Sequence, residues 1–385
     1  MSGYEDSVPA YLTIRVTAQD SPIAAFADQE AWLARDLYPH LMGVGVGEFF
    51  HAREHETGGW ELSEFGENRP QAARDSLGSH FRWRAKEAED AGQEKARRAW
   101  AAAALRMDRA VVDDIRVQGE RFRIVRASHF IRMGSAGPEP PRPSDPDPGE
   151  VGEAHLLASR TKGFLVDPFT GTGLSEGILK LDLVQFVGAV PGAPEEIAED
   201  ARRAAVAYPG GVLLPAVFLV SERVDGRWKL HSPGSSFSTP QGARDSLAAW
   251  LRVMAPFTHD LPEDVCARYA EAADRFDAKR AHVLSVDGQR FRITRVERLM
   301  RIGPDGPEGP RPSDFDPDPP IEVQVRQLKE QGRWKEEDDD RPFEPDERTV
   351  KLRRLWEREH ARRAALKQRG GNGGSSGNGR AGGIG

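Results

Sequence analysis

The sequence predicts an α+β fold that is a tandem duplication of one unit, with pseudo-twofold symmetry between the two copies. Two observations carry this prediction. Residues 119–145 match residues 288–314 at a constant offset of 169, with 16 of 27 positions identical. Upstream, the stretch from Pro70 to Leu77 recurs with a single change 170 residues later. Matches of this number in the same order indicate a duplicated gene segment rather than chance.

The repeat divides the chain of 385 residues into five parts. The first unit covers residues 11–148 and the second unit residues 179–320, with a connector of residues 149–178 between them. A charged tail with a helical pattern is expected at residues 321–369. Residues 370–385 are rich in Gly, Ser and Asn, a composition typical of disorder.

Each unit is expected to begin with a strand followed by a helix. Alternation of apolar and polar residues has the period of a half-buried strand. Proline is favoured at the first helical position, and the residue before a proline avoids helical geometry, so prolines mark both ends of the helix. The paired signals are the alternating runs from Leu12 to Val16 and from Leu179 to Leu183, Pro22 and Pro194, and the pairs Tyr38-Pro39 and Tyr208-Pro209.

The remainder of each unit is expected to hold two strands, two helices and a closing hairpin. The signals are the apolar runs 44–50 and 212–220, strands around Trp60 and Trp228, helices from Pro70 and Pro240, helix breaks at Gly92, Pro256 and Pro262, and turns at Gln118-Gly119 and Asp287-Gly288. The resulting order is β-α-β-β-α-α-β-β. It resembles an elaborated ferredoxin-like layer, with helices on one face of a mostly antiparallel sheet.

Proline-rich arms end both units. Residues 138–148 hold six prolines and residues 304–320 hold seven, a density that excludes helix and favours extended polyproline II geometry. We expect each arm to lie as a strap across its own unit or the neighbouring one, held by Arg142 and Arg311. The Pro-x-x-Pro spacing in both arms also suits an aromatic groove on a protein partner.

The strand sequence Arg-Phe-Arg-Ile and the arm Gly-Pro-x-Gly-Pro-Glu-x-Pro-Arg-Pro-Ser-Asp resemble an actinobacterial family of unknown function that occurs mainly in Streptomyces-type genomes. The resemblance covers roughly residues 10–320, and the arm is its most specific part. It implies no activity, cofactor or catalytic residue, so it bears on organisation alone.

Composition favours a soluble, cytoplasmic protein. Hydrophobic residues make up 38% and charged residues 30% of the chain, and the formal net charge is −7. No apolar run approaches the roughly 20 residues that a membrane span requires, and the first residues lack the pattern of a secretory signal. The lone Cys266 excludes a disulfide framework within the chain. The acidic balance argues against nucleic-acid binding by the whole chain.

The charged tail is the one segment that could contact nucleic acid or an acidic protein partner. Residues 336–347 carry a net charge of −7 and residues 348–369 a net charge of +7. The basic segment has the composition of a nucleic-acid contact. Neutralisation by its acidic neighbour is the simpler explanation.

Duplicated arginines and aspartates are the candidate ligand-binding residues. One set lies in the first turns of matching helices, where an acid also complements the helix dipole. If those helices face a shared cleft, Arg74 and Arg244 would reach one anionic ligand. A second set alternates with apolar residues on matching strands, where a solvated strand face is the alternative. The candidates are Arg74, Asp75, Arg244, Asp245, Arg121, Arg123, Arg290 and Arg292.

Other motifs fall short of a recognised site. The loop from Thr170 to Gly177 lacks the lysine of a phosphate-binding loop and is expected to lead into a strand, as a turn or a lid between the units. His51 and His55 lie four residues apart, but the second unit has no histidine there, which favours a surface pair. The acidic segments 142–147 and 311–316 lack the pattern of a calcium loop. No catalytic residue, metal site or cofactor is predicted.

Two hypotheses of function follow. The first is a non-enzymatic protein that acts through protein contacts made by the proline arms or the charged tail. The second is a protein or enzyme that binds a small anionic molecule in a cleft between the two units, where ligand sites often lie.

Overall fold

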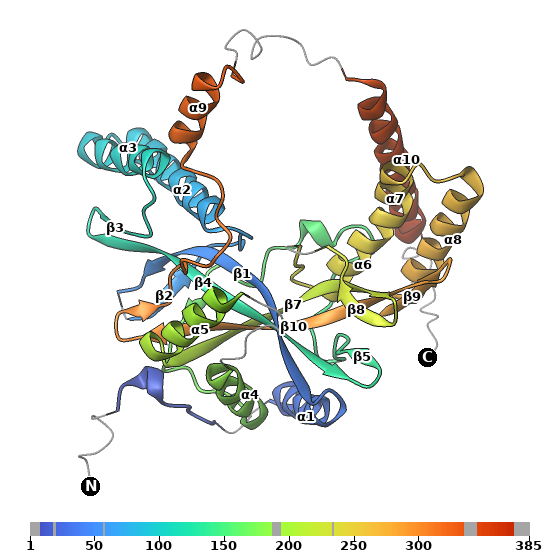
Figure 1. Ribbon diagram of the computed structural model, residues 1–385, viewed down its shortest axis with the longest axis horizontal. Helices are drawn as coiled ribbons and strands as arrows, with labels where there is room; N and C mark the ends of the chain where they lie inside the picture. Colours follow the sequence, from blue (N-terminus) through green and yellow to red (C-terminus); the bar gives the residue numbers. More distant parts are fainter. Residues whose placement is uncertain are drawn as a thin grey trace, which may run out of the picture.

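A computed structural model describes residues 8–17, 21–56, 58–186, 194–232, 235–334 and 345–372. One antiparallel sheet of eleven strands lies at its centre (Figure 1). Its main path runs in the order β6-β2-β1-β4-β10-β7-β8, while β3 and β5 pair with β4, and β9 and β11 pair with β10. The strands are β1 (His40–Glu54), β2 (Trp60–Leu62), β3 (Asp114–Val117), β4 (Glu120–Gly134), β5 (Gly137–Pro138), β6 (Leu165–Val166), β7 (Gly210–Val224), β8 (Arg227–Leu230), β9 (Val283–Val286), β10 (Gln289–Gly303) and β11 (Gly306–Pro307).

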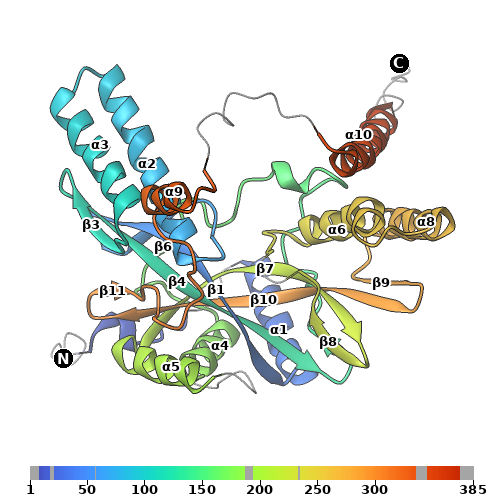
Figure 2. The same cartoon turned by 45° about the horizontal axis from the view of Figure 1, so that its top comes forward.

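Helices cover both faces of this sheet. They are α1 (Pro22–Leu37), α2 (Pro70–Asp90), α3 (Glu94–Arg109), α4 (Leu174–Gln185), α5 (Glu195–Ala207), α6 (Pro240–Ala249), α7 (Ala255–Thr258), α8 (Glu263–Lys279), α9 (Ile321–Glu330) and α10 (Glu347–Asn372). Figure 2 shows α2, α3, α6 and α8 on one side of the sheet and α1, α4 and α5 on the other. The mixed α and β content agrees with the predicted fold class, but the prediction that helices cover one face is wrong.

Two separate hydrophobic cores lie beneath the helix pairs. Under α2 and α3, Phe81, Trp100 and Phe122 pack together at ring distances of 5.1 to 6.1 Å. Under α6 and α8, a second cluster is built around Leu251 and Phe291. Strands β4 and β10 lie side by side in the middle and join the two ends of the sheet.

The predicted first strand of each unit is wrong. Residues Ala10–Leu12 form a 3-10 turn, after which only Val16 makes an isolated bridge, to Thr172. Leu179 and Leu183 lie inside α4 and are buried with Leu299 of β10. Apolar residues four positions apart also share one face of a helix, so five alternating residues fit both structures, and packing against the sheet decides for the helix.

The helix boundaries follow the prolines, with one difference. Helix α1 begins at Pro22, and Gly92 with φ of +68° separates α2 from α3, as predicted. Pro256 does not break the chain's helical path, because a π-helical turn (Trp250–Met254) directly precedes α7 and continues into it. The wider π turn makes room for the proline ring, which would clash with a regular α-turn. The helical path is interrupted at residues 259–262, and Pro262 is the N-cap of α8.

Each proline arm lies on the opposite unit. The amide of Arg295 donates to the carbonyl of Glu139 at 2.9 Å, and the amide of Arg126 donates to the carbonyl of Glu308 at 2.8 Å. The arm of the first unit therefore adds to β10, and the arm of the second unit adds to β4. Each arm also contacts its own unit at its start, where β5 pairs with β4 and β11 pairs with β10, and the amide of Ser144 donates to Glu30 of α1 at 2.9 Å.

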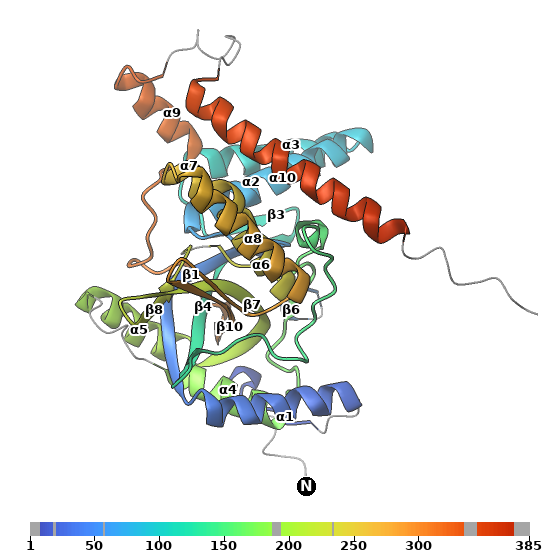
Figure 3. The same ribbon diagram turned by 90° about the vertical axis from the view of Figure 1, so that its right-hand side faces the viewer.

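The tail returns to the body of the protein. Helix α9 contacts α3, and Arg109 bonds Glu322 at 2.7 Å. Figure 3 shows α10 alongside α7, and Glu359 of α10 is buried beside Arg252 of the π-helical turn before α7. Residues 335–344, which include most of the acidic segment, and the Gly/Ser/Asn-rich residues 373–385 lie outside the described residues. No helix among the described residues has both the length and the apolar composition to cross a bilayer.

Candidate functional site

Arg74 of α2 and Arg244 of α6 are both buried, with 3% and 1% of their surfaces exposed. Arg244 binds Asp147 of the first arm. Arg74 binds Asp316 of the second arm at 2.5 Å and Asp113 at 2.7 Å. The two arginines thus bind separate carboxylates, and α2 and α6 cover different ends of the sheet (Figure 1).

The same arm aspartates also cap the two helices. Asp316 accepts the amide hydrogen of Gln71 at 2.9 Å, and Asp147 accepts that of Gln241 at 2.8 Å. Free amides at a helix start favour a carboxylate. Burial alone would lower the pKa of Arg74, but its bonds to Asp113 and Asp316 outweigh burial and raise that pKa. These contacts give Arg74 and Arg244 a role in fixing the arms.

The neighbouring aspartates differ between the two helices. Asp75 is exposed and accepts a hydrogen bond from Gln71 at 2.9 Å. Asp245 accepts the backbone amides of Gly152 at 2.8 Å and Ala154 at 3.2 Å, so it positions the connector. Asp245 also lines a pocket, whereas Asp75 does not.

The strand arginines hold the base of each arm. Arg123 donates to the carbonyl of Pro307 at 3.3 Å and lies 5.0 Å from the ring centre of Trp60. Arg292 donates to the carbonyl of Pro138 at 2.8 Å and lies 5.2 Å from the ring centre of Trp228.

The outer pair of strand arginines is less alike. Arg121 bonds both Asp114 and Asp305, while Arg290 is exposed on β10. Hydrogen bonds from Arg121 and Arg123 hold the pKa of Asp305 well below its usual range. The alternative of a solvated strand face is therefore wrong for the buried Arg123 and Arg292.

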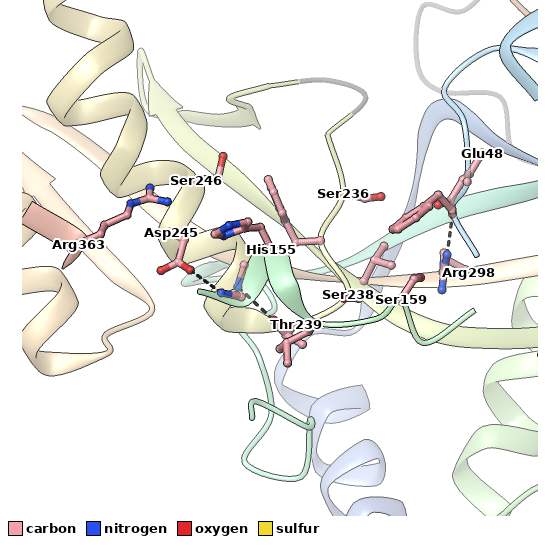
Figure 4. A pocket seen from close by; sticks show the side chains of 17 residues that line it. Glu48, His155, Ser159, Ser236, Ser238, Thr239, Asp245, Ser246, Arg298 and Arg363 are labelled. Atoms are coloured by element: carbon pink, nitrogen blue, oxygen red, sulfur yellow. Dashed lines mark hydrogen bonds and ion pairs between the residues drawn. The ribbon is translucent and has the colours of Figure 1, made fainter. Parts of the chain in front are cut away.

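A pocket of about 320 Å³ lies where the two units, the connector and the tail meet. In Figure 4, Glu48 and Arg298 lie at one end of it, and Asp245 and Arg363 at the other. Its lining residues are Glu48, Phe65, Gly66, Ala154, His155, Leu157, Ser159, Val217, Ser236, Phe237, Ser238, Thr239, Gly242, Asp245, Ser246, Arg298 and Arg363. We call this space the inter-unit pocket.

A buried charged group forms one end of the inter-unit pocket. Glu48 Oε2 accepts hydrogen bonds from Arg298 Nη1 at 2.8 Å and pairs with His129 Nε2 at 3.0 Å. Burial raises the pKa of Glu48, but Arg298 and His129 outweigh it and lower that pKa to about 2. Gly66 is required beside this carboxylate, because a Cβ there would come 2.2 Å from Glu48 Oε1. Glu48 is thus ionised and fixed at neutral pH.

Hydroxyl groups line the middle of the pocket. The side-chain hydroxyls of Ser236, Ser238 and Ser246 make no hydrogen bond with another described residue, whereas Thr239 Oγ1 accepts the amide of Gly242 at 3.1 Å. At the far end, Arg363 is bound to Glu359 at 2.8 Å and to the carbonyl of Gly152 at 3.3 Å. The pocket therefore offers neutral polar groups between charges that are already paired.

The other motifs are occupied by contacts within the chain. The loop from Thr170 leads into α4 rather than into a strand, and the amide of Ser175 donates to Asp28 at 2.8 Å. Asp145 and Asp314 of the two arms bind Arg295 and Arg126 at 3.1 and 3.0 Å. Across the described ranges, no group of three or more His, Cys, Asp or Glu residues is placed to hold a metal ion.

Sequence reasoning did not identify Glu48, His129 and Arg298 as site residues. The available signal was Glu48 itself, an acid within the otherwise apolar run 44–50 that predicts a buried strand. A carboxylate in such a strand requires a buried partner. Which residue supplies it depends on the pairing of β1, β4 and β10.

Fold and site together define an α+β protein with an antiparallel sheet of eleven strands and a polar pocket beside it. The chain belongs to a family of unknown function, DUF5954, which matches residues 21–317. Comparisons with curated proteins and with solved structures gave no match.

Proposed function

We propose that the chain is a tandem duplication with exchanged arms that binds a small molecule in the inter-unit pocket. The duplication is supported by contacts that recur at the sequence offset. Arg126 binds Asp314 as Arg295 binds Asp145. A Cβ on Gly137 would meet Trp228, just as one on Gly306 would meet Trp60.

The ligand that suits this pocket is an uncharged compound with several hydroxyl groups, such as a polyol or a sugar. Glu48 is neutralised by Arg298, and Arg363 by Glu359. Asp245 already accepts two backbone amides and the side chain of Gln241. Among the described lining residues, both guanidinium groups already bind carboxylates, which disfavours the anionic ligand expected from the sequence. The three unpartnered serine hydroxyls carry the proposal.

Binding is favoured over catalysis. A serine nucleophile needs a hydrogen-bonded base. Ser236, Ser238 and Ser246 form no hydrogen bond to such a group among the described residues. His129 is instead directed at Glu48.

A role through protein contacts has weaker support. The proline arms use their carboxylates and several carbonyl groups on the same chain, at Arg74, Arg244, Arg123 and Arg292. A groove on a partner would have to replace these buried contacts. The charged tail is the surface on which such a proposal would rest.

A thermal-shift screen of the full chain tests the proposed ligand class, with neutral sugars and polyols in one set and phosphates and carboxylates in the other. A ligand at about 100 times its Kd stabilises by about 2.7 kcal/mol, which raises the Tm by several degrees. We expect a saturable shift in the neutral set. Shifts confined to the anionic set, or no saturable shift in the neutral set, would contradict the proposal.

Two matched variants test whether the ligand that causes the thermal shift binds in the inter-unit pocket. Ser238→Leu fills part of the inter-unit pocket and should abolish the shift. Ser285→Leu makes the same change on the exposed side of β9, outside the pocket, and should retain it. Equal shifts in both variants would place the ligand elsewhere.

A further inference from the structure

A second and larger cavity lies on the first unit, between α2 and the strands β1 and β2. Its volume is about 720 Å³. The lining residues that bear on its chemistry are His51, Ser63, His80, Trp83, Arg84 and Phe122. We call it the histidine cavity. Apart from Phe65, it shares no lining residue with the inter-unit pocket.

Two imidazoles in this cavity have buried nitrogen atoms without partners. They are Nδ1 of His51 and Nε2 of His80, and the ring centres lie 5.5 Å apart. Leaving a buried polar atom unpaired costs about 1–3 kcal/mol. Such atoms in a cavity wall therefore indicate a missing hydrogen-bonding partner.

Both histidines are neutral at physiological pH. Burial, helped by the neighbouring His80, lowers the pKa of His51 to about 4. Burial and the nearby Arg84 also lower the pKa of His80, against an opposing effect of Glu120. Each neutral ring offers one donor and one acceptor.

The second unit fills the corresponding place with its own side chains. The residue 170 positions after His80 is Trp250, at the offset that relates Arg74 to Arg244. The indole of Trp250 lies edge-on to His231, with ring centres 4.4 Å apart, and 5.6 Å from Phe291.

The surroundings of these two places correspond. The amide of Ser63 donates to the carbonyl of His51 at 2.9 Å, and the amide of His231 donates to the carbonyl of Val220 at the same distance. Ser63 thus stands where the second unit has His231, and His80 stands where it has Trp250. The first unit therefore has the smaller side chains Ser63 and His80 where the second unit has His231 and Trp250, and a cavity is open there.

We propose that the histidine cavity binds a planar nitrogen heterocycle of about the size of an indole or a nucleobase. The imidazoles of His51 and His80 would each form a hydrogen bond with a ring nitrogen of this ligand, either as donor or as acceptor. Phe122, which forms the floor, corresponds to Phe291 beneath Trp250. Trp83 is 57% exposed beside His80, with ring centres 5.9 Å apart, and supplies an aromatic face at the entrance.

Indole and zinc chloride are the probes, each titrated separately into the full chain and followed by calorimetry and by the NMR signals of the imidazoles. We expect saturable binding of indole with shifts of the His51 and His80 signals. Absence of saturable indole binding, or shifts of these signals by zinc alone, would overturn the proposal.

Variants test the comparison between the units. His80→Trp introduces the indole that the second unit has at Trp250. It should fill the cavity, weaken indole binding at least tenfold and raise the Tm. His51→Val introduces the residue found at the matched Val220 and should weaken indole binding at least tenfold. Ser79→Trp adds an indole on the exposed side of α2 and should leave binding unchanged. Unchanged binding in both histidine variants would refute the proposal, whereas binding of polyols to the inter-unit pocket should persist in all three.

Discussion

The two arm aspartates should contribute unequally to stability, although their positions correspond. Asp147→Asn removes the only carboxylate that Arg244 binds among the described residues, and Arg244 is almost completely buried. Asp316→Asn leaves Arg74 with a second carboxylate, Asp113, at 2.7 Å. Because Arg244 has one carboxylate partner and Arg74 has two, Asp147→Asn should lower the free energy of unfolding more than Asp316→Asn.

The magnitudes follow from these partners. Removing one member of a buried ion pair costs about 3–5 kcal/mol, because the other charge stays buried. Asp147 is partly exposed, which places Asp147→Asn at the lower end, about 3 kcal/mol. Losing one of two charged hydrogen bonds costs about 1.5–3 kcal/mol, and retention of Asp113 places Asp316→Asn near 1.5 kcal/mol.

Equilibrium unfolding in urea, followed by tryptophan fluorescence, measures both free energies of unfolding. Asp225→Asn is the control, since it makes the same chemical change in the exposed turn between β7 and β8. It should alter stability by less than about 0.5 kcal/mol. Equal losses in the two arm variants, or a larger loss for Asp316→Asn, would refute the reasoning from partners.

Three further predictions follow from individual contacts. Glu48→Gln should lower the free energy of unfolding by about 3–5 kcal/mol at pH 7, because the buried Arg298 loses its carboxylate; a loss below about 1 kcal/mol in urea unfolding would contradict this. The low pKa of His51 means that only the unfolded chain takes up its proton between pH 6.5 and about 4, so stability should fall by about 2 kcal/mol from pH 7 to pH 5. Subtracting the pH profile of His51→Gln isolates this contribution, and identical profiles would exclude it. Gly137→Ala places a Cβ 2.4 Å from Trp228 at a φ of +112°, so its Tm should fall by several degrees, and an unchanged Tm in a thermal scan would disprove the close packing.

Sequence patterns predicted the elements whose signals are local. Asp287 and Gly288, both at positive φ, form the turn between β9 and β10, and Pro22 begins α1. Local alternation failed at Leu179 and Leu183, because the same spacing fits a helix and only the sheet beneath decides. The arrangement of the arms could not be predicted either, since no local property of an extended proline segment selects the unit on which it lies.

In the candidate site too, local sequence patterns identified some residues, while others are brought together only by the tertiary fold. Repetition made Arg74 and Arg244 candidates for an anionic ligand, but the carboxylates they bind in the structure are arm aspartates of the same chain. Glu48 and Arg298 are 250 positions apart, and they meet only because β1, β4 and β10 are neighbours in the sheet. The inter-unit pocket is likewise assembled from two units, the connector and α10, so no single segment carries its pattern.

The most direct test of the proposed function is a calorimetric titration of the full chain with the neutral compound that gives the largest thermal shift, repeated with Ser238→Leu and Ser285→Leu. We predict one binding site per chain in the wild type and in Ser285→Leu, with affinity at least tenfold weaker in Ser238→Leu. Equal affinity in all three proteins, or no saturable heat in the wild type, would contradict a ligand site between the two units.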